Sequence, residues 1–109
     1  MAMVIKRFDV YLVNLNPTIG SEIQKTRPCL VISPDEMNRN IRTVIIAPMT
    51  SAQRDYPTRV SCIFNNKQGH IVLDQIRTID RQRLIKKLGT IDSRAQLDVI
   101  SILQRLFAF

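Results

Sequence analysis

Apolar residues in this chain come in short runs that polar stretches interrupt, which is the pattern of many short β-strands. Between positions 60 and 64 the apolar side chains recur at every second residue, as in a half-buried strand. The segment Asn65 to Gly69 follows and predicts a hairpin turn, because Asn and Gly accept positive φ. The runs that predict strands are Phe8 to Leu15, Cys29 to Ile32, Thr43 to Ala47 (ending at Pro48), Thr58 to Phe64, His70 to Ile76 and Lys87 to Ile91.

The C-terminal region predicts the clearest helix. Ser93 with Gln96 three residues later fits a capping box, and Asp92 adds negative charge at the same end. Apolar residues then repeat at helical spacing in a broad stripe, which packs mostly on the core and leaves a part that can face a partner chain. The stripe consists of Ala95, Val99, Ile102 and Leu106, flanked by Ile100, Leu103 and Phe107.

Two further segments carry weaker helical signals. Asp80 can cap a short helix over Arg81 to Lys87, and the polar connection from Pro34 to Arg42 has room for one helical turn. Five or six short strands at hairpin-like spacing, closed by one helix, predict a small, mostly antiparallel β-barrel.

Length and composition limit the class of protein. The 109 residues fit a single domain over 1–109, and 45% apolar residues suffice for one core. The sequence contains no run of 18 apolar residues, so no membrane span is predicted. The N-terminus lacks a signal-peptide pattern, so we expect a cytoplasmic protein. Cys29 and Cys62 lie far apart within apolar runs, and His70 stands alone. We therefore expect buried thiols, no metal and no cofactor.

The charge balance points to a polyanionic partner. Sixteen basic against nine acidic residues give a net charge of +7, so RNA or DNA is the first expectation. The alternative is a generally soluble basic surface. A membrane surface fits less well, because no segment combines a basic face with Trp or Phe anchors.

The segment from Asn14 to Ser33 carries the first candidate chemistry. A polar loop over positions 20–26 holds Glu22, and an apolar run follows, so Arg27 stands where a charged loop meets a buried strand. Pro28 biases Arg27 toward extended backbone, which partly fixes its direction. A cation placed in this way is suited to bind a phosphate group. The alternative is that Arg27 is an ordinary surface residue at the start of a strand.

Three polar clusters fall at the ends of predicted strands, and a small barrel can bring such ends together at one opening. The alternative is that these residues have local structural roles: Asp74 pairs with Arg77, and Thr50 and Ser51 form hydrogen bonds to the backbone of a turn. The basic stretch from Arg77 to Lys87 is a candidate track for a nucleic-acid backbone. The clusters are Glu22 with Lys25 and Arg27, Thr50 with Ser51, and Asp74 with Gln75 and Arg77.

Four ordered blocks, NPTIGSE, KTRPCLVIS, APMTS and LDQIRTID, resemble the MazF/PemK family of toxins from toxin–antitoxin pairs. The resemblance extends from about Asp9 to Gly89. It implies an SH3-like, CcdB-type barrel with a C-terminal helix, a homodimer, and an endoribonuclease that cuts single-stranded RNA without a metal. It also implies an antitoxin partner whose acidic, flexible tail lies across the RNA groove.

The resemblance assigns roles to particular residues. The essential Arg of the family falls on Arg27 and its active-site Thr on Thr50. The loop carboxylate falls on Glu22, and the acid of the last block on Asp74, with Gln75 beside it.

Three positions depart from the family pattern. Phe8 stands where the family usually has Gly, Ser21 where some members have His, and Val72 where some have Arg. A mechanism that uses those His and Arg groups is therefore excluded here.

Metal-free RNA cleavage uses the 2′-OH of the substrate as nucleophile, and the protein must move two protons and stabilise charge on phosphorus. We expect Arg27 and Thr50 at the phosphate. Glu22 is the preferred base over Asp74, and His70 contributes only if it reaches the site. The loops over positions 20–26 and 51–56 are expected to read bases. The expected RNA-binding residues are Ser21, Gln24, Lys25, Ser51, Arg54, Gln75 and Arg77.

Other functions compete with the endoribonuclease. A gyrase poison of the CcdB type shares the implied fold but lacks the pair that Arg27 and Thr50 form. A catalytically inactive barrel would bind nucleic acid in a salt-sensitive way without cutting it. A purely structural interaction domain leaves the four matching blocks unexplained.

Overall fold

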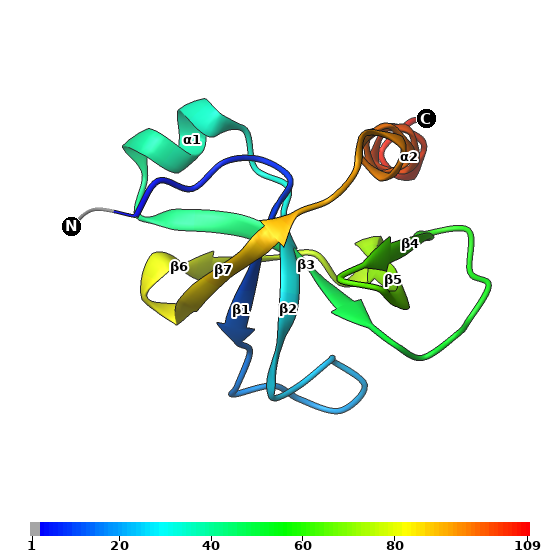
Figure 1. Cartoon of the computed structure of the whole chain (residues 1–109), viewed down its shortest axis with the longest axis horizontal. Coiled ribbons are helices and arrows are strands. Elements are labelled where there is room, and N and C mark those ends of the chain that lie inside the picture. Colours follow the sequence, from blue (N-terminus) through cyan, green and yellow to red (C-terminus); the bar gives the residue numbers. More distant parts are fainter. Residues whose placement is uncertain (1–2) are drawn as a thin grey trace.

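The computed structural model describes residues 3–109, in which seven strands form one curled antiparallel sheet with a helix across one end (Figure 1). The strands are β1 (Asp9–Asn14), β2 (Thr26–Val31), β3 (Thr43–Thr50), β4 (Arg59–Phe64), β5 (Lys67–Val72), β6 (Arg77–Asp80) and β7 (Leu84–Thr90). The helices are α1 (Asp35–Asn40) and α2 (Ser93–Leu106), and the 3-10 turns are η1 (Leu73–Gln75) and η2 (Arg81–Arg83). The predicted fold, a mainly β antiparallel barrel with a C-terminal helix, is confirmed in the form of a half-barrel.

The sheet has the strand order β4-β5-β3-β2-β1-β7, with β6 paired separately on β3. The first half of β3 pairs with β6 through Ile46, and its last two residues pair with β5. This division lets one long strand belong to two parts of the curled sheet. It also places the end of β3 beside the β4–β5 hairpin.

The expected end of the third strand at Pro48 is wrong, because β3 continues to Thr50. Pro48 pairs with Cys29 of β2. On its other side, pairing with β6 stops at Ile46 and pairing with β5 starts at Met49. The N–H that proline lacks is therefore not needed on that side, and the strand tolerates the residue.

Three other local predictions need correction. The helix expected over 81–87 is only the short turn η2, followed by β7, which therefore starts at Leu84 and not at Lys87. Asp80 does cap η2, since its Oδ1 accepts a hydrogen bond from Gln82 N at 2.8 Å. Pairing with β1 then overrides the helical tendency. The strand expected over 70–76 ends at Val72, and β6 was not predicted at all.

The β4–β5 hairpin is confirmed, but the turn predicted over 65–69 is shorter: it consists of Asn65 and Asn66, at φ of 51° and 63°, and β5 starts at Lys67 and not at His70. Asparagine tolerates this left-handed region better than most residues. Gly69 lies inside β5, where a Cβ would come within 2.9 Å of Thr50 O. The missing side chain therefore allows β5 to approach the end of β3 closely.

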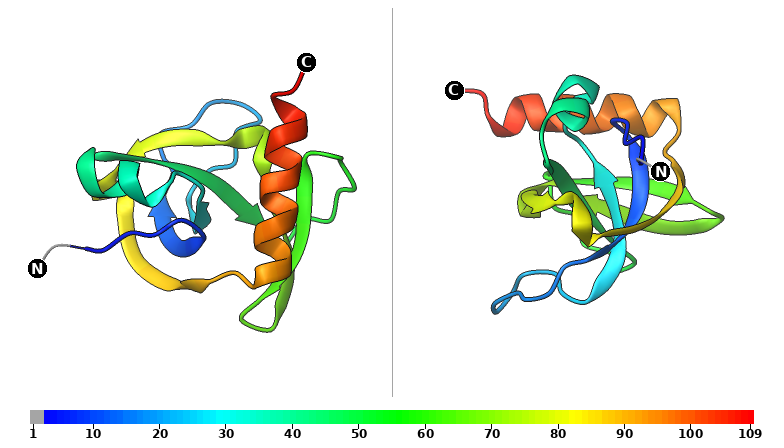
Figure 2. Two further views of the ribbon diagram at one scale, coloured as in Figure 1. Left: turned by 90° about the horizontal axis from the view of Figure 1, so that it is seen from above. Right: turned by 90° about the vertical axis from the view of Figure 1, so that its left-hand side faces the viewer.

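Helix α2 lies along the β4–β5 side, at the end of the molecule away from the β1–β2 loop (Figure 2). Its N-cap is Asp92, whose Oδ1 accepts from Ala95 N at 2.8 Å, so the predicted cap at Ser93 is one residue too late. The predicted apolar stripe packs on the core at Ala95 and Val99. Its C-terminal end stays exposed at Phe107.

The core has two parts, one on each face of the sheet. The part facing α2 includes Val10, Leu30 and Ile71, and the part on the opposite face includes Tyr11 and Val13. Both cysteines are free and buried, as predicted. Burial raises the pKa of Cys29 to about 12, so this thiol stays protonated near neutral pH.

Candidate nucleic-acid interface

The end of β3 places Thr50 in a row of side chains that crosses the sheet. Thr50 pairs with His70 on β5, and His70 pairs with Ser61 on β4. Directly opposed residues of antiparallel strands project from the same face. His70, whose role the sequence left open, is therefore a neighbour of Thr50. It is only 6% exposed, and its Nδ1 has no hydrogen-bond partner within residues 3–109.

Arg27 lies near the same end of β3. The pairing of β2 with β3 ends at Cys29 and Pro48, and Arg27 and Thr50 each lie two residues beyond that pair. Arg27, Thr50 and Ser51 line one pocket of about 330 Å³. Strand pairing thus brings together two residues that lie 23 positions apart in the chain.

Both side chains have hydrogen-bond donors to spare. Arg27 Nε donates to Gln24 O at 3.0 Å, which orients the guanidinium, and its two terminal nitrogens make no hydrogen bond within the described chain. Thr50 Oγ1 accepts from Ala52 N at 3.1 Å. The hydroxyl oxygen thus accepts a hydrogen bond from the backbone of the turn, which is the alternative role that the sequence predicted. The hydroxyl hydrogen is still available to a ligand.

The two acidic candidates, Glu22 and Asp74, line a second pocket of about 270 Å³ together with Pro48. Pro48 and Met49 are neighbours on β3, and each lines one of the two pockets. The predicted clusters therefore do not converge on one cavity. The residues in the second pocket are Glu22, Asp74, Gln75 and Arg77.

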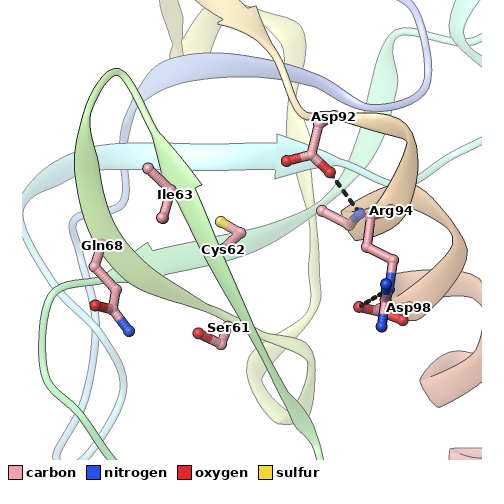
Figure 3. Close-up of a pocket in the computed structure, with 8 residues that line it drawn as sticks. Ser61, Cys62, Ile63, Gln68, Asp92, Arg94 and Asp98 are labelled. Atoms are coloured by element: carbon pink, nitrogen blue, oxygen red, sulfur yellow. Dashed lines mark hydrogen bonds and ion pairs between the residues drawn. The ribbon is translucent and has the colours of Figure 1, made fainter.

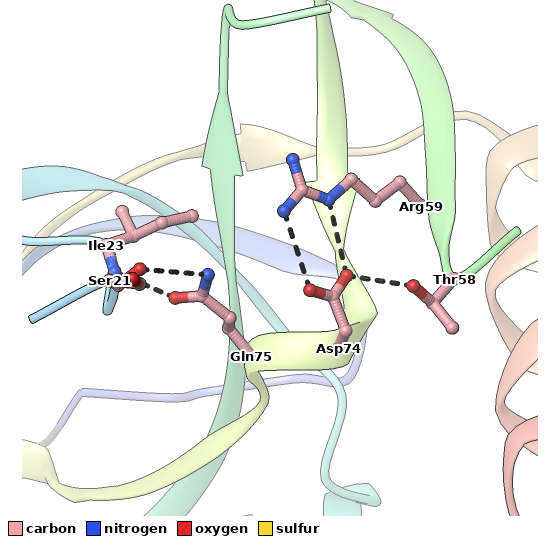
Figure 4. Close-up of polar contacts among 6 residues, drawn as sticks. All are labelled: Ser21, Ile23, Thr58, Arg59, Asp74 and Gln75. Carbon is pink, nitrogen blue, oxygen red and sulfur yellow. Dashed lines mark hydrogen bonds and ion pairs between the residues drawn. The ribbon is translucent and has the colours of Figure 1, made fainter. Parts of the chain in front are cut away.

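Asp74 is paired with Arg59, and the alternative pairing with Arg77 is wrong (Figure 4). Arg59 donates from Nε to Oδ1 at 3.3 Å and from Nη2 to Oδ2 at 3.5 Å, and Thr58 Oγ1 donates to Oδ1 at 3.0 Å. Burial acts to raise the pKa of Asp74. The hydrogen bonds from Arg59 and Thr58 outweigh it and hold that pKa below its usual value. Asp74 is therefore a weak proton acceptor near neutral pH.

Gln75 and Arg77 hold the β1–β2 loop in place. Gln75 Oε1 accepts from Ile23 N at 2.7 Å, and its Nε2 donates to Ser21 O at 3.4 Å. Arg77 Nη1 donates to Leu15 O at 3.0 Å. Their side-chain hydrogen bonds thus go to loop backbone, which positions the loop that carries Glu22.

Glu22 uses one carboxylate oxygen within the loop, where Oε1 accepts from Ile19 N at 2.6 Å. Its second oxygen makes no hydrogen bond in the described part of the chain. The other residues expected to bind RNA are all exposed to solvent; they are Ser21, Gln24, Lys25, Ser51 and Arg54.

The sequence reasoning assigned no role to Arg59, and it placed Tyr56 only within the loop over positions 51–56 that is expected to read bases. Arg59 lies 15 residues before Asp74, and nothing in the sequence indicates that the two pair. Tyr56 is half exposed and lies against the Arg59 guanidinium, with 4.9 Å between the ring centroid and Cζ. The signal available in the sequence was an aromatic residue within a polar loop.

A third pocket, of about 290 Å³, lies between α2 and the β4–β5 hairpin and contains none of the predicted site residues (Figure 3). Cys62 lines it beside Asp92 and Asp98. Burial, reinforced by Asp92, raises the pKa of this thiol. Residues 3–109 contain no group of three His, Cys, Asp or Glu residues able to hold a metal ion. No helix in that range is both long and apolar enough to cross a membrane.

Residues 6–107 match the model of a protein family described as PemK-like, MazF-like toxins of type II toxin–antitoxin systems. The chain belongs to this toxin family. The resemblance seen in its four sequence blocks is thereby confirmed.

Individual toxin-family relatives agree with this assignment. The chain is 39% identical over 108 residues to Endoribonuclease EndoA of Bacillus subtilis (strain 168), covering 94% of this chain and 93% of the relative. The crystal structure of MazF (Form-I) from Deinococcus radiodurans matches with a TM-score of 0.87 and 25% identity, covering 99% of this chain and 100% of that one. A mycobacterial endoribonuclease in complex with its cognate antitoxin has the same fold, with a TM-score of 0.81 at 21% identity over 96% and 98% of the chains.

Proposed function

We propose that this toxin-family member is an endoribonuclease that cuts single-stranded RNA, with Arg27 and Thr50 at the scissile phosphate. The observation that carries the proposal is the adjacency of these two residues in one pocket, each with unused donors. The names of the relatives and the net charge of +7 support an RNA substrate.

In this reaction the 2′ oxygen gives up its proton and attacks phosphorus, and the bond from phosphorus to the 5′ oxygen breaks as that oxygen takes up a proton from water. The products carry a 2′,3′-cyclic phosphate and a 5′-OH. Arg27 can donate from both terminal nitrogens to the non-bridging oxygens, where negative charge develops. Thr50 can donate its hydroxyl hydrogen to the same phosphate. These hydrogen bonds strengthen as charge accumulates and so lower the barrier.

Glu22 is the proposed base that takes the 2′ proton. One of its carboxylate oxygens is free of hydrogen bonds within residues 3–109, whereas both oxygens of Asp74 accept hydrogen bonds from Arg59 or Thr58, which lower its pKa and make it the weaker base. Because Glu22 and Thr50 line neighbouring pockets, the RNA has to cross Pro48 to reach both. The scissile nucleotide therefore has to lie across this boundary, with its 2′-OH toward Glu22 and the adjacent phosphate toward Arg27 and Thr50, and an unpaired strand can be splayed in this way.

The proposed partners follow from the toxin family. The family description and the mycobacterial complex support an antitoxin, whose acidic, flexible tail would compete with RNA for the basic pockets. We also propose a homodimer. The exposed apolar end of α2, at Leu106 and Phe107, leaves a surface for a second chain. A cytoplasmic location fits an RNA substrate.

The test is incubation of the purified protein with mixed-sequence single-stranded RNA in EDTA, followed by analysis of the product ends. The proposal predicts discrete cuts with cyclic-phosphate and 5′-OH ends. Arg27→Ala and Thr50→Val should each slow cleavage by about 10²–10³-fold, because each removes a donor to the transition state.

Two variants control for unrelated effects. Thr50→Ser keeps the hydroxyl and should keep most of the activity. Arg94→Ala removes an equally charged but highly exposed residue of α2, outside both pockets, and should cleave at the normal rate. Full activity of Arg27→Ala and Thr50→Val would overturn the assignment. Intact RNA with the wild-type protein would favour a gyrase poison, which a supercoiling assay detects, or a binding-only protein.

A further inference from the structure

We propose that Tyr56 is a stacking platform that binds one unpaired base of the RNA. This inference rests on the proposed function, because it requires a single-stranded RNA substrate. It adds a base subsite and a specificity-determining residue to the pockets that hold the phosphate.

The Tyr56 ring is supported by Arg59 and remains accessible to solvent. The Arg59 guanidinium lies against the ring, 4.9 Å from its centroid, while 51% of the residue stays exposed. An aromatic ring with a free face is what proteins use to bind bases of single-stranded RNA, since every base has a flat face that can stack. A cation behind the ring is itself favourable through a cation–π interaction.

The support behind the ring is rigid. Arg59 is fixed by its two hydrogen bonds to Asp74, and Thr58 holds the same carboxylate (Figure 4). The Arg59 side chain is 10% exposed, so it moves little on its own. The platform is therefore formed before RNA arrives, which reduces the entropy lost on binding.

Backbone hydrogen bonds fix the position of the ring in the loop. Tyr56 N donates to Arg54 O at 2.9 Å, and Arg59 N donates to Tyr56 O at 3.0 Å. The loop starts directly after Thr50 and ends at Arg59, whose partner Asp74 lines the second pocket. A base stacked on Tyr56 thus belongs to the strand of RNA that passes Thr50 and Asp74.

A competing interpretation is that Tyr56 only covers Arg59 and contributes stability. The two interpretations differ in one measurable way. If Tyr56 has only a structural role, the effect of the Tyr56→Ala substitution on cleavage does not depend on whether a particular base is present in the RNA. We therefore use RNA substrates that lack a single base, so that the loss of the base and the loss of the ring can be combined.

The experiment measures kcat/KM for a cleavable oligonucleotide and for a series with one abasic nucleotide at each position around the cut. With wild-type protein, one position outside the scissile nucleotide should lose about 5- to 100-fold when its base is removed. Tyr56→Ala should lose a similar factor, mainly through KM, and should no longer respond to the base at that position. Tyr56→Phe should stay within about twofold of wild type. Arg94→Ala should respond to the abasic series as wild type does.

A binding measurement separates stacking from cleavage. The chain has two Tyr and no Trp, and Tyr11 is 1% exposed, so quenching of tyrosine fluorescence by RNA reports on Tyr56. An oligonucleotide that is 2′-deoxy at the cut site should quench this signal without being cleaved, and its abasic counterpart should quench less. Quenching without cleavage by the wild type would refute the proposed function and support the platform.

Three results would overturn the platform. Tyr56→Ala could keep the wild-type sensitivity at every abasic position. Tyr56→Phe could lose as much activity as Tyr56→Ala, which would assign the effect to the hydroxyl. RNA could also leave the tyrosine fluorescence of the wild type unchanged.

Discussion

Individual side chains around the two pockets are fixed by partners that are distant in the sequence. Asp74 is the clearest example, because its carboxylate accepts hydrogen bonds from both Thr58 and Arg59. These donors stabilise the charged form and thereby link the protonation of Asp74 to the stability of the fold.

Asp74→Asn should therefore destabilise the protein in a pH-dependent way. The pKa of Asp74 is lowered in the folded state from the ordinary value of 3.8, so its stabilising contribution is present above about pH 4 and is lost as the pH falls through the folded value. The side chain is partly exposed, which limits the contribution to about 1 kcal/mol or less. Urea unfolding at pH 6 and pH 3 should show a larger difference between wild type and variant at pH 6. An equal or larger difference at pH 3 would contradict this linkage.

Phe8 shows at the same scale how a departure from the family pattern is accommodated. The resemblance in the sequence predicts Gly at this position, and Phe8 has a φ of 75°, in the left-handed region that favours Gly. Its N–H donates to Val31 O at 2.7 Å and its carbonyl accepts from Ile91 N at 3.2 Å. The backbone conformation is thus held even though the residue has changed.

At the scale of elements, local signals predicted most of the strands and the terminal helix. They failed where pairing with distant strands decides the outcome, as for β7, whose buried Leu84 pairs with Val13 in a segment that had helical signals. The strand β6 has only four residues, which is too short for an alternation of apolar and polar residues to predict it. The cap of α2 was misplaced by one residue, because Asp92 and Ser93 are both good capping residues.

The misplaced cap gives a matched pair of variants. Asp92→Ala should destabilise the protein by about 1 kcal/mol, because it removes the acceptor for Ala95 N–H at the start of α2. Ser93→Ala should have almost no effect, because Ser93 is already inside the helix. Denaturant midpoints for the two variants and wild type provide the comparison. A larger loss for Ser93→Ala would place the cap where the sequence pattern suggested.

In the molecule as a whole, the curled sheet brings residues from separate sequence blocks into two neighbouring pockets. Through family resemblance the sequence proposed Arg27 and Thr50 as candidate site residues, and the basic charge pointed to a polyanionic partner. It could not reveal that the sheet brings those two residues into one pocket, nor that Glu22 and Asp74 line a neighbouring pocket. Both facts depend on strand register between distant segments.

The most direct test of the account compares two RNA oligonucleotides that differ only in the nucleotide before the cut, one with a 2′-OH and one with 2′-deoxy, in EDTA. We predict that the first is cleaved to cyclic-phosphate and 5′-OH ends, and that the second binds with similar affinity but remains intact. Cleavage of the 2′-deoxy oligonucleotide at the same site would contradict an attack by the 2′ oxygen, and with it the roles assigned to Arg27, Thr50 and Glu22.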